Sequence, residues 1–218
     1  MGTEGRIVRG TPAGPWTSRH HRWEPADRWW PHGLPVRDAE ESGRELARRW
    51  LARFGPATVD DLQWWTGWNS TTTRRALHGL ALEEVDLHGV AGVALPVDTD
   101  EADDPIEPGE PVAALLPALD PTPMGWRHRD WFFGIEQREV FDRAGNVGPT
   151  LWWDGEVVGS WATTPSGEVI TLLRVDRGAH AGKAIEAAAH HLSLRLEGTR
   201  VTPAARTPLE RAIETGPH

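Results

Sequence analysis

Between Ser42 and Leu95 the chain has a pattern that few folds accommodate: three short amphipathic segments come first, and two apolar runs follow. The segments are Ser42–Phe54, Thr58–Thr66 and Ser70–Leu80, and the runs are Val85–Leu87 and Val93–Leu95. In the first segment, apolar residues recur at helical spacing on one face and arginines occupy the other. Glycines lie between the two runs. We therefore expect three helices followed by a hairpin of two strands.

Local signals set the expected helix boundaries. Ser42 with Glu45 three residues later is the pattern of a capping box, in which the hydroxyl and the carboxylate each accept a backbone N–H. Thr58 with Asp61 starts the second helix, and Gly67 is suited to the C′ position that closes it. Three helices and then a small hairpin make the order of a winged helix, a fold most often used to bind duplex DNA.

The third helix carries the features that favour DNA contact. Its N-terminal half reads Ser70-Thr71-Thr72-Thr73-Arg74-Arg75, which is short, hydroxylated and basic. A helix in a major groove needs such a surface to bond phosphates and base edges. The alternative is an ordinary solvated face, because charge patterning is weak evidence when taken alone. The capped helices before it and the hairpin after it favour DNA contact by Ser70, Thr71, Thr73, Arg74 and Arg75.

The charge of the chain is unevenly distributed. The net charge is −9, but residues 1–79 hold 12 Lys and Arg against nine Asp and Glu, a net +3, which leaves −12 for residues 80–218. Seven acids and no base lie between Asp98 and Glu110. A protein can bind DNA with one basic face while its opposite side is acidic. The acidic half also leaves binding to a protein open.

Composition narrows the class of protein. The absence of cysteine excludes disulfides and thiolate metal sites and fits a reducing cytosol. No apolar run approaches the roughly 20 residues of a membrane span, and the first residues lack the apolar core of a signal peptide. His190 and His191 are adjacent, so they point to different faces of a helix and make a poor metal site. We expect a cytoplasmic, nucleoid-associated monomer without membrane contact, metal or small-molecule cofactor.

Residues 1–37 do not read as the start of a domain. Gly5–Gly10 is a short strand with no partner ahead of it, and the Pro-, Gly- and Trp-rich passage Thr11–Pro35 follows. We expect residues 1–37 to be the remnant of a preceding winged-helix unit and an irregular linker, with another domain preceding Met1. Arg19 and Arg22 could follow a DNA backbone; a loop packed by its tryptophans is the alternative.

Residues 38–97 are the expected winged-helix domain, 98–110 an acidic linker, and 111–218 a second α+β unit. In this unit we expect a helix starting at Asp120-Pro121, whose Arg127, His128 and Arg129 give a second DNA contact. Closely spaced strands from Val140, with an Asp154-Gly155 hairpin turn, predict a small antiparallel β-barrel or curled sheet. Further elements are expected at Ala179–Leu196 (helix), Arg200–Thr202 (strand) and from about Thr207 (helix).

Four groups of residues, in order along the chain, resemble the tandem winged-helix proteins of the AlkZ/YcaQ DNA glycosylase family. They are Phe54-Gly55-Pro56-Ala57-Thr58 with Asp61-Leu62 and Trp65; Leu116-Pro117 with Asp120, Gly125-Trp126-Arg127 and Arg129-Asp130; Val140 to Val147; and Asp154-Gly155 with Val158-Gly159-Ser160-Trp161. The resemblance covers nearly the whole chain. It implies several winged helices, a small β-barrel, binding to double-stranded DNA, and hydrolysis of the N-glycosidic bond of alkylated or cross-linked bases.

The catalytic signature of that family, a Gln-x-Gln or Gln-x-Asp pair in its first winged helix, has no match here. The only glutamines are Gln63 and Gln137, and neither is followed by Gln or Asp two residues later. We therefore carry over no catalytic residue and expect a DNA repair protein that is catalytically incomplete. Two alternatives stay open. One is an active glycosylase in which Asp120 or Glu136 holds the water, and the other is a transcription regulator or protein-interaction module.

Overall fold

Residues 4–18, 20–96, 109–203 and 206–215 are described by the computed structural model, in which the chain forms two units, Met1–Gly43 and Arg44–His218. The helices are α1 Ala39–Phe54, α2 Val59–Thr66, α3 Ser70–Leu77, α4 Gln137–Val140, α5 Gly178–Leu196 and α6 Pro208–Thr215, with 3-10 turns η1 Ala26–Arg28, η2 Thr122–Met124 and η3 Asp130–Phe132. The strands are β1 Ile7–Pro12, β2 His21–Pro25, β3 Glu83–Leu87, β4 Val90–Ala94, β5 Ala113–Leu116, β6 Thr150–Trp153, β7 Glu156–Thr163 and β8 Val169–Leu173. No helix in this described part combines the length and the apolar composition of a membrane span.

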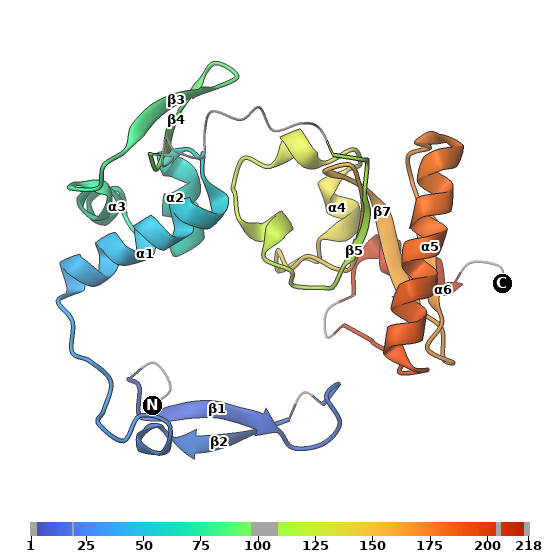
Figure 1. Cartoon of the computed structure of the whole chain (residues 1–218), viewed down its shortest axis with the longest axis horizontal. Coiled ribbons are helices and arrows are strands. Elements are labelled where there is room, and N and C mark those ends of the chain that lie inside the picture. Colours follow the sequence, from blue (N-terminus) through green and yellow to red (C-terminus); the bar gives the residue numbers. More distant parts are fainter. Residues whose placement is uncertain (1–3, 19, 97–108, 204–205, 216–218) are drawn as a thin grey trace. The chain divides into compact units, whose positions relative to one another are not determined.

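The first unit contains an antiparallel pair, β1 and β2, followed by η1 (Figure 1). The strand predicted near Gly5–Gly10 exists, and its partner is β2, within the passage that we expected to be irregular. Arg9 lies opposite Trp23 in the register, and its guanidinium is 6.0 Å from the indole centroid. This cross-strand contact of a cation with an indole contributes to the pairing of β1 with β2.

The three predicted helices and the hairpin form in the predicted order, with shifted boundaries. The first helix begins at Ala39 because Asp38 Oδ1 accepts the N–H groups of Glu40 and Glu41. The predicted cap at Ser42 is therefore wrong, since the Ser42 N–H already bonds back to Asp38 within the helix. The second helix has the expected start: Thr58 and Asp61 form a complete capping box.

The partner predicted for Ser42 has a different role. Glu45 accepts hydrogen bonds from Arg48 and Arg49 at 2.8 and 2.6 Å. The two arginines lie three and four residues after Glu45, so all three side chains are neighbours on one face of the helix. These bonds, that from Arg48 first, lower the pKa of the Glu45 carboxyl to about 2. Two arginines of α1 are thereby engaged within their own helix.

The helices α1–α3 share one core with the hairpin. Trp50, Leu51, Leu62 and Ala76 are buried in it, as the helical spacing predicted. The third helix ends at Leu77, three residues earlier than predicted, because His78 is extended and Gly79 has φ +84°.

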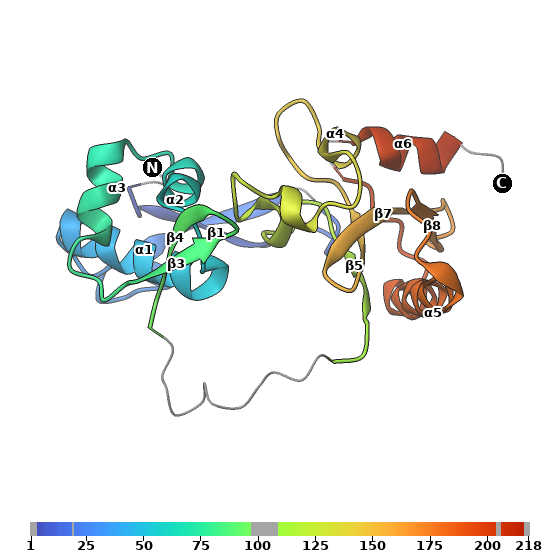
Figure 2. The same cartoon turned by 90° about the horizontal axis from the view of Figure 1, so that it is seen from above.

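The second half of the large unit is built on an open four-stranded antiparallel sheet, in the order β5-β6-β7-β8 (Figures 1 and 2). The predicted barrel does not form, because β5 and β8 are the two edges and do not pair with each other. Adjacent residues alternate between two buried clusters: Trp152 and Val157 pack with Phe132, whereas Leu151 and Val158 pack with Ile185 of α5. Elements on each face thus bury the sheet without closure.

Three elements of this region differ from prediction. Two 3-10 turns, η2 and η3, stand in place of the helix expected from Asp120. The Asp120 carboxylate accepts the Thr122 N–H at the first turn. Gly125 lies so close to Phe54 that a Cβ at this position would be 2.3 Å from the Phe54 ring. The strand expected at Val140 is the short helix α4. Residues 200–202 form no strand, although Val201 exchanges two hydrogen bonds with the Thr163 hydroxyl. The Asp154-Gly155 turn between β6 and β7 is confirmed, with φ of 48° and 83°.

Candidate nucleic-acid interface

The helix α3 presents the candidate DNA-binding face. Asn69 caps it by accepting the Thr72 N–H at 2.9 Å, and Ala76 and Leu77 fix its opposite side in the core. This packing leaves Ser70, Thr71, Arg74 and Arg75 exposed. Hydroxyl and guanidinium groups on one exposed turn are suited to bonding phosphate oxygens.

Thr73 does not lie on that face. Its side chain is fully buried, and its hydroxyl donates to the Asn69 carbonyl at 3.0 Å. The physical reason is helical periodicity: residue 73 lies three positions before Ala76 and four before Leu77, on the side that faces the core. Thr73 is therefore removed from the predicted contact residues.

Arg74 and Arg75 are exposed on α3 and differ in their contacts from the arginines of α1. Within the described ranges neither makes a salt bridge, in contrast to Arg48 and Arg49 of α1. A guanidinium that is exposed and lacks an internal carboxylate can bind a phosphate without first breaking an intramolecular bond. The structure leaves these two side chains accessible, and their contact with DNA stays a prediction.

The residues of the second predicted contact, 127–129, are largely engaged in internal contacts. Arg127 Nη1 lies 2.9 Å and His128 Nε2 3.1 Å from the same Asp60 oxygen on α2. Both side chains stay more than half exposed, at 55% and 61%. Their outer surfaces remain accessible, but part of the Arg127 charge is balanced by Asp60.

Asp61, the neighbour of Asp60, joins α2 to this loop. Its Oδ2 accepts from the backbone and hydroxyl of Thr58, and its Oδ1 accepts the N–H groups of Arg127 and His128, both at 2.9 Å. The residue is 2% exposed. One buried carboxylate therefore caps a helix and holds a loop that is more than 60 residues away in sequence. Of this bonding, sequence reasoning recognised only the capping role.

Arg129 makes more internal contacts than its two neighbours in the loop. Its guanidinium lies 4.2 Å from the Phe141 centroid and 5.3 Å from that of Trp64, and its Nε donates to Gln137 Oε1. Burial lowers the pKa of Arg129 from its usual value, and the charge of Asp130 opposes the shift. These contacts occupy much of the Arg129 side chain, which is only partly exposed, and its contact with DNA stays a prediction.

The other predicted contacts lie in the first unit or outside the described residues. Arg22 is exposed on β2, and no salt bridge is found for it within the described residues. Arg19 lies outside the described residues, as does most of the predicted acidic linker 98–110. In the hairpin β3–β4, the exposed side chains of Glu83, Glu84 and Asp86 are acidic, so phosphate contact there is disfavoured.

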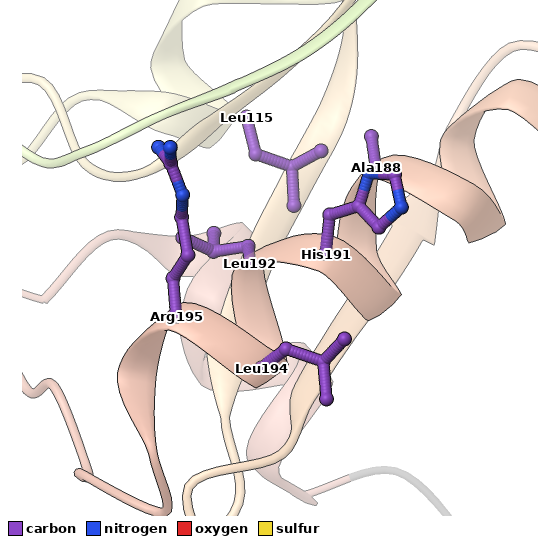
Figure 3. A pocket seen from close by; sticks show the side chains of 6 residues that line it. All are labelled: Leu115, Ala188, His191, Leu192, Leu194 and Arg195. Carbon is purple, nitrogen blue, oxygen red and sulfur yellow. The ribbon is translucent and has the colours of Figure 1, made fainter.

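The carboxylates considered for catalysis are not drawn into a catalytic arrangement. Asp120 is bonded to the turn that it starts, and Glu136 is exposed at the N-terminus of α4 without a capping bond. Neither lines the hollow of about 570 Å³ between β5 and α5. Four apolar side chains line that hollow, with His191 and Arg195 flanking them (Figure 3). Among the described residues no cluster of three or more His, Asp or Glu could hold a metal ion.

Comparison with known proteins decides the family. A family model described as "DNA glycosylase AlkZ-like" matches residues 1–214, almost the whole chain. The chain belongs to the AlkZ-like DNA glycosylase family. Membership confirms the resemblance seen in the sequence.

The fold agrees with this assignment to the AlkZ-like family. The solved structure of the DNA glycosylase AlkZ of Streptomyces sahachiroi matches with a TM-score of 0.70 at 21% identity, over 91% of this chain and 54% of that one. The chain thus spans about half the length of that structure. None of the curated proteins matches the chain.

Proposed function

We propose that this chain is a DNA-binding part of an AlkZ-like repair protein for alkylated or cross-linked DNA. In this proposal α1–α3 and β3–β4 form a winged helix, and α3 lies against duplex DNA. The observation that carries it is the exposed pair Arg74 and Arg75, without internal salt bridges within the described residues, on a capped helix whose other side is in the core. Ser70 and Thr71 would add hydroxyl donors to the same phosphates.

The double variant Arg74→Ala/Arg75→Ala tests this role. Each phosphate contact contributes about −0.9 to the slope of log affinity against log salt concentration, so we expect the slope to become shallower by about 2. Affinity for all duplex sequences should fall by about tenfold or more near 0.1 M salt, because phosphate contacts do not depend on the base sequence. A salt-controlled fluorescence anisotropy titration measures both.

The matched control is Arg138→Ala/Arg143→Ala, which removes the same charge from two exposed arginines elsewhere in the unit. It should retain the slope of the unmodified protein. If the two double variants weaken binding equally, net charge rather than α3 determines affinity, and the proposal for α3 is refuted.

We propose further that the chain alone does not cleave the glycosidic bond. The support is chemical: of the two glutamines, Gln137 accepts from Arg129 and donates to Asp130, so it is engaged in holding the loop, and Gln63 has no paired Gln or Asp. Hydrolysis needs a group that holds and activates water.

A base-release assay tests this second part. Incubated in excess over methylated duplex DNA, the protein should release no more alkylated base than buffer does. Time-dependent release that Asp120→Asn or Glu136→Gln abolishes would instead establish an active enzyme with unusual catalytic residues.

A further inference from the structure

Trp131 is largely exposed although the loop before it is held by hydrogen bonds to Asp61. It exposes 66% of its surface, although it follows the loop that Asp61 holds and its ring contacts the buried ring of Phe132. A large apolar side chain that remains accessible on a well-anchored segment is a feature of binding surfaces. Its surroundings indicate what it binds.

Two aromatic side chains pack against the Trp131 ring and position it. The ring packs edge-to-face on Trp126 and Phe132, with centroids 5.4 and 4.7 Å away and interplanar angles of 79° and 85°. Trp126 is itself anchored, because its Nε1–H donates to the Phe54 carbonyl at 2.8 Å. An exposed ring that is already ordered loses little conformational entropy when a ligand packs on it.

Accessible side chains that can donate hydrogen bonds lie three and four residues before Trp131. Arg127 and His128 precede it on the same loop, and their side chains are more than half exposed. The nearby acids are engaged: Asp60 bonds the side chains of Arg127 and His128, and Asp130 accepts from Gln137. The loop therefore has little net charge, and stacking on the indole, rather than attraction of phosphates, would supply most of its affinity.

A planar ring is the ligand that such an indole binds best. In intact duplex DNA both faces of each base are covered by its neighbours, so only an unpaired or extruded base can offer a face for stacking. We propose that Trp131 stacks on an unpaired nucleobase of DNA, with Arg127 next to the adjoining phosphate. The inference rests on the proposed DNA binding and adds to it a preference for DNA with a disrupted base pair.

The test uses two duplexes that contain the same 2-aminopurine, fully paired in one and bulged in the other. Stacking on an aromatic ring is expected to make the bulged duplex bind about tenfold more tightly than the paired one. The fluorescence of the bulged 2-aminopurine should also fall on binding, as stacking quenches it. Anisotropy gives the affinities, and steady-state emission gives the quenching.

Three variants separate stacking from other effects. Trp131→Ala should lose the preference and the quenching while keeping its affinity for the paired duplex. Trp131→Phe retains an aromatic ring and should keep part of both. Trp16→Ala removes an equally exposed indole, 63% accessible, from the first unit and should change neither.

The outcomes distinguish this inference from the proposal that it extends. Equal affinity of the unmodified protein for both duplexes, or an unchanged preference in Trp131→Ala, overturns stacking while leaving duplex binding intact. If the unmodified protein binds neither duplex, the proposed DNA binding fails and the stacking site fails with it. Loss of quenching in Trp16→Ala but not in Trp131→Ala would assign stacking to the first unit instead.

Discussion

Replacing Asp61 by alanine is expected to lower the free energy of unfolding by about 3–5 kcal/mol. The part-buried N–H groups of Thr58, Arg127 and His128 lose a shared charged acceptor, and a hydrogen bond to a charged group contributes about 1.5–3 kcal/mol. For a chain of this size the melting temperature should fall by about 10 °C. Thermal unfolding followed by circular dichroism, together with urea titration, measures the change.

The neighbouring residue provides the control for Asp61. Asp60 bonds Arg127 and His128 through their side chains, and all three groups are largely exposed, so Asp60→Ala should cost less than about 1 kcal/mol. Asp61→Asn keeps an oxygen acceptor in nearly the same place and should fall between the two. An Asp61→Ala variant as stable as Asp60→Ala would show that the buried carboxylate does not hold the loop.

The second large effect is expected at Phe132. Its side chain is 2% exposed and packs with Trp126, Trp131 and Trp152, the last in a stacked arrangement with centroids 5.4 Å apart. Phe132→Ala removes the ring from between these indoles and leaves a cavity, for an expected cost of about 3–5 kcal/mol. The near-ultraviolet dichroism should weaken as well, since the surrounding tryptophans lose their fixed packing.

Phe132→Leu separates loss of volume from loss of aromatic contact. It keeps most of the apolar volume and should cost less than about 1.5 kcal/mol. Trp131→Ala, although it removes a larger side chain, should cost little, because most of that ring is in water. A destabilisation by Trp131→Ala equal to that by Phe132→Ala would mean that Trp131 is a core residue, which also contradicts its proposed role in stacking.

The helical region was the best predicted from sequence, because its signals are local. The Thr58–Asp61 capping box, the Gly67 C-cap and the apolar spacing of the core residues act between positions at most four apart. The errors there were competitions between local alternatives. Asp38 rather than Ser42 caps the first helix, and Thr73 is buried in the core rather than exposed to solvent.

The sheet region was predicted less well, because strand pairing and edge placement are long-range. The close spacing of the segments and the Asp154-Gly155 turn indicated strands, but nothing local states that α5 would cover one face and leave β5 and β8 as open edges. The loop from Asp120 was read as a helix from its start signal. Tertiary contacts overrode that signal where Gly125 and Trp126 pack against Phe54.

The sequence by itself determined the family, the order of the helices and hairpin, and the arginine pair on α3, since these depend on motifs and on periodicity within single elements. Only the tertiary structure decided that Arg127 and His128 bond to Asp60, that Arg129 is enclosed between aromatic rings, and that Asp61 fastens α2 to a distant loop. The physical reason is that a charged side chain looks the same in sequence whether its partner is water, a phosphate or a carboxylate 60 residues away. Folding alone selects the partner.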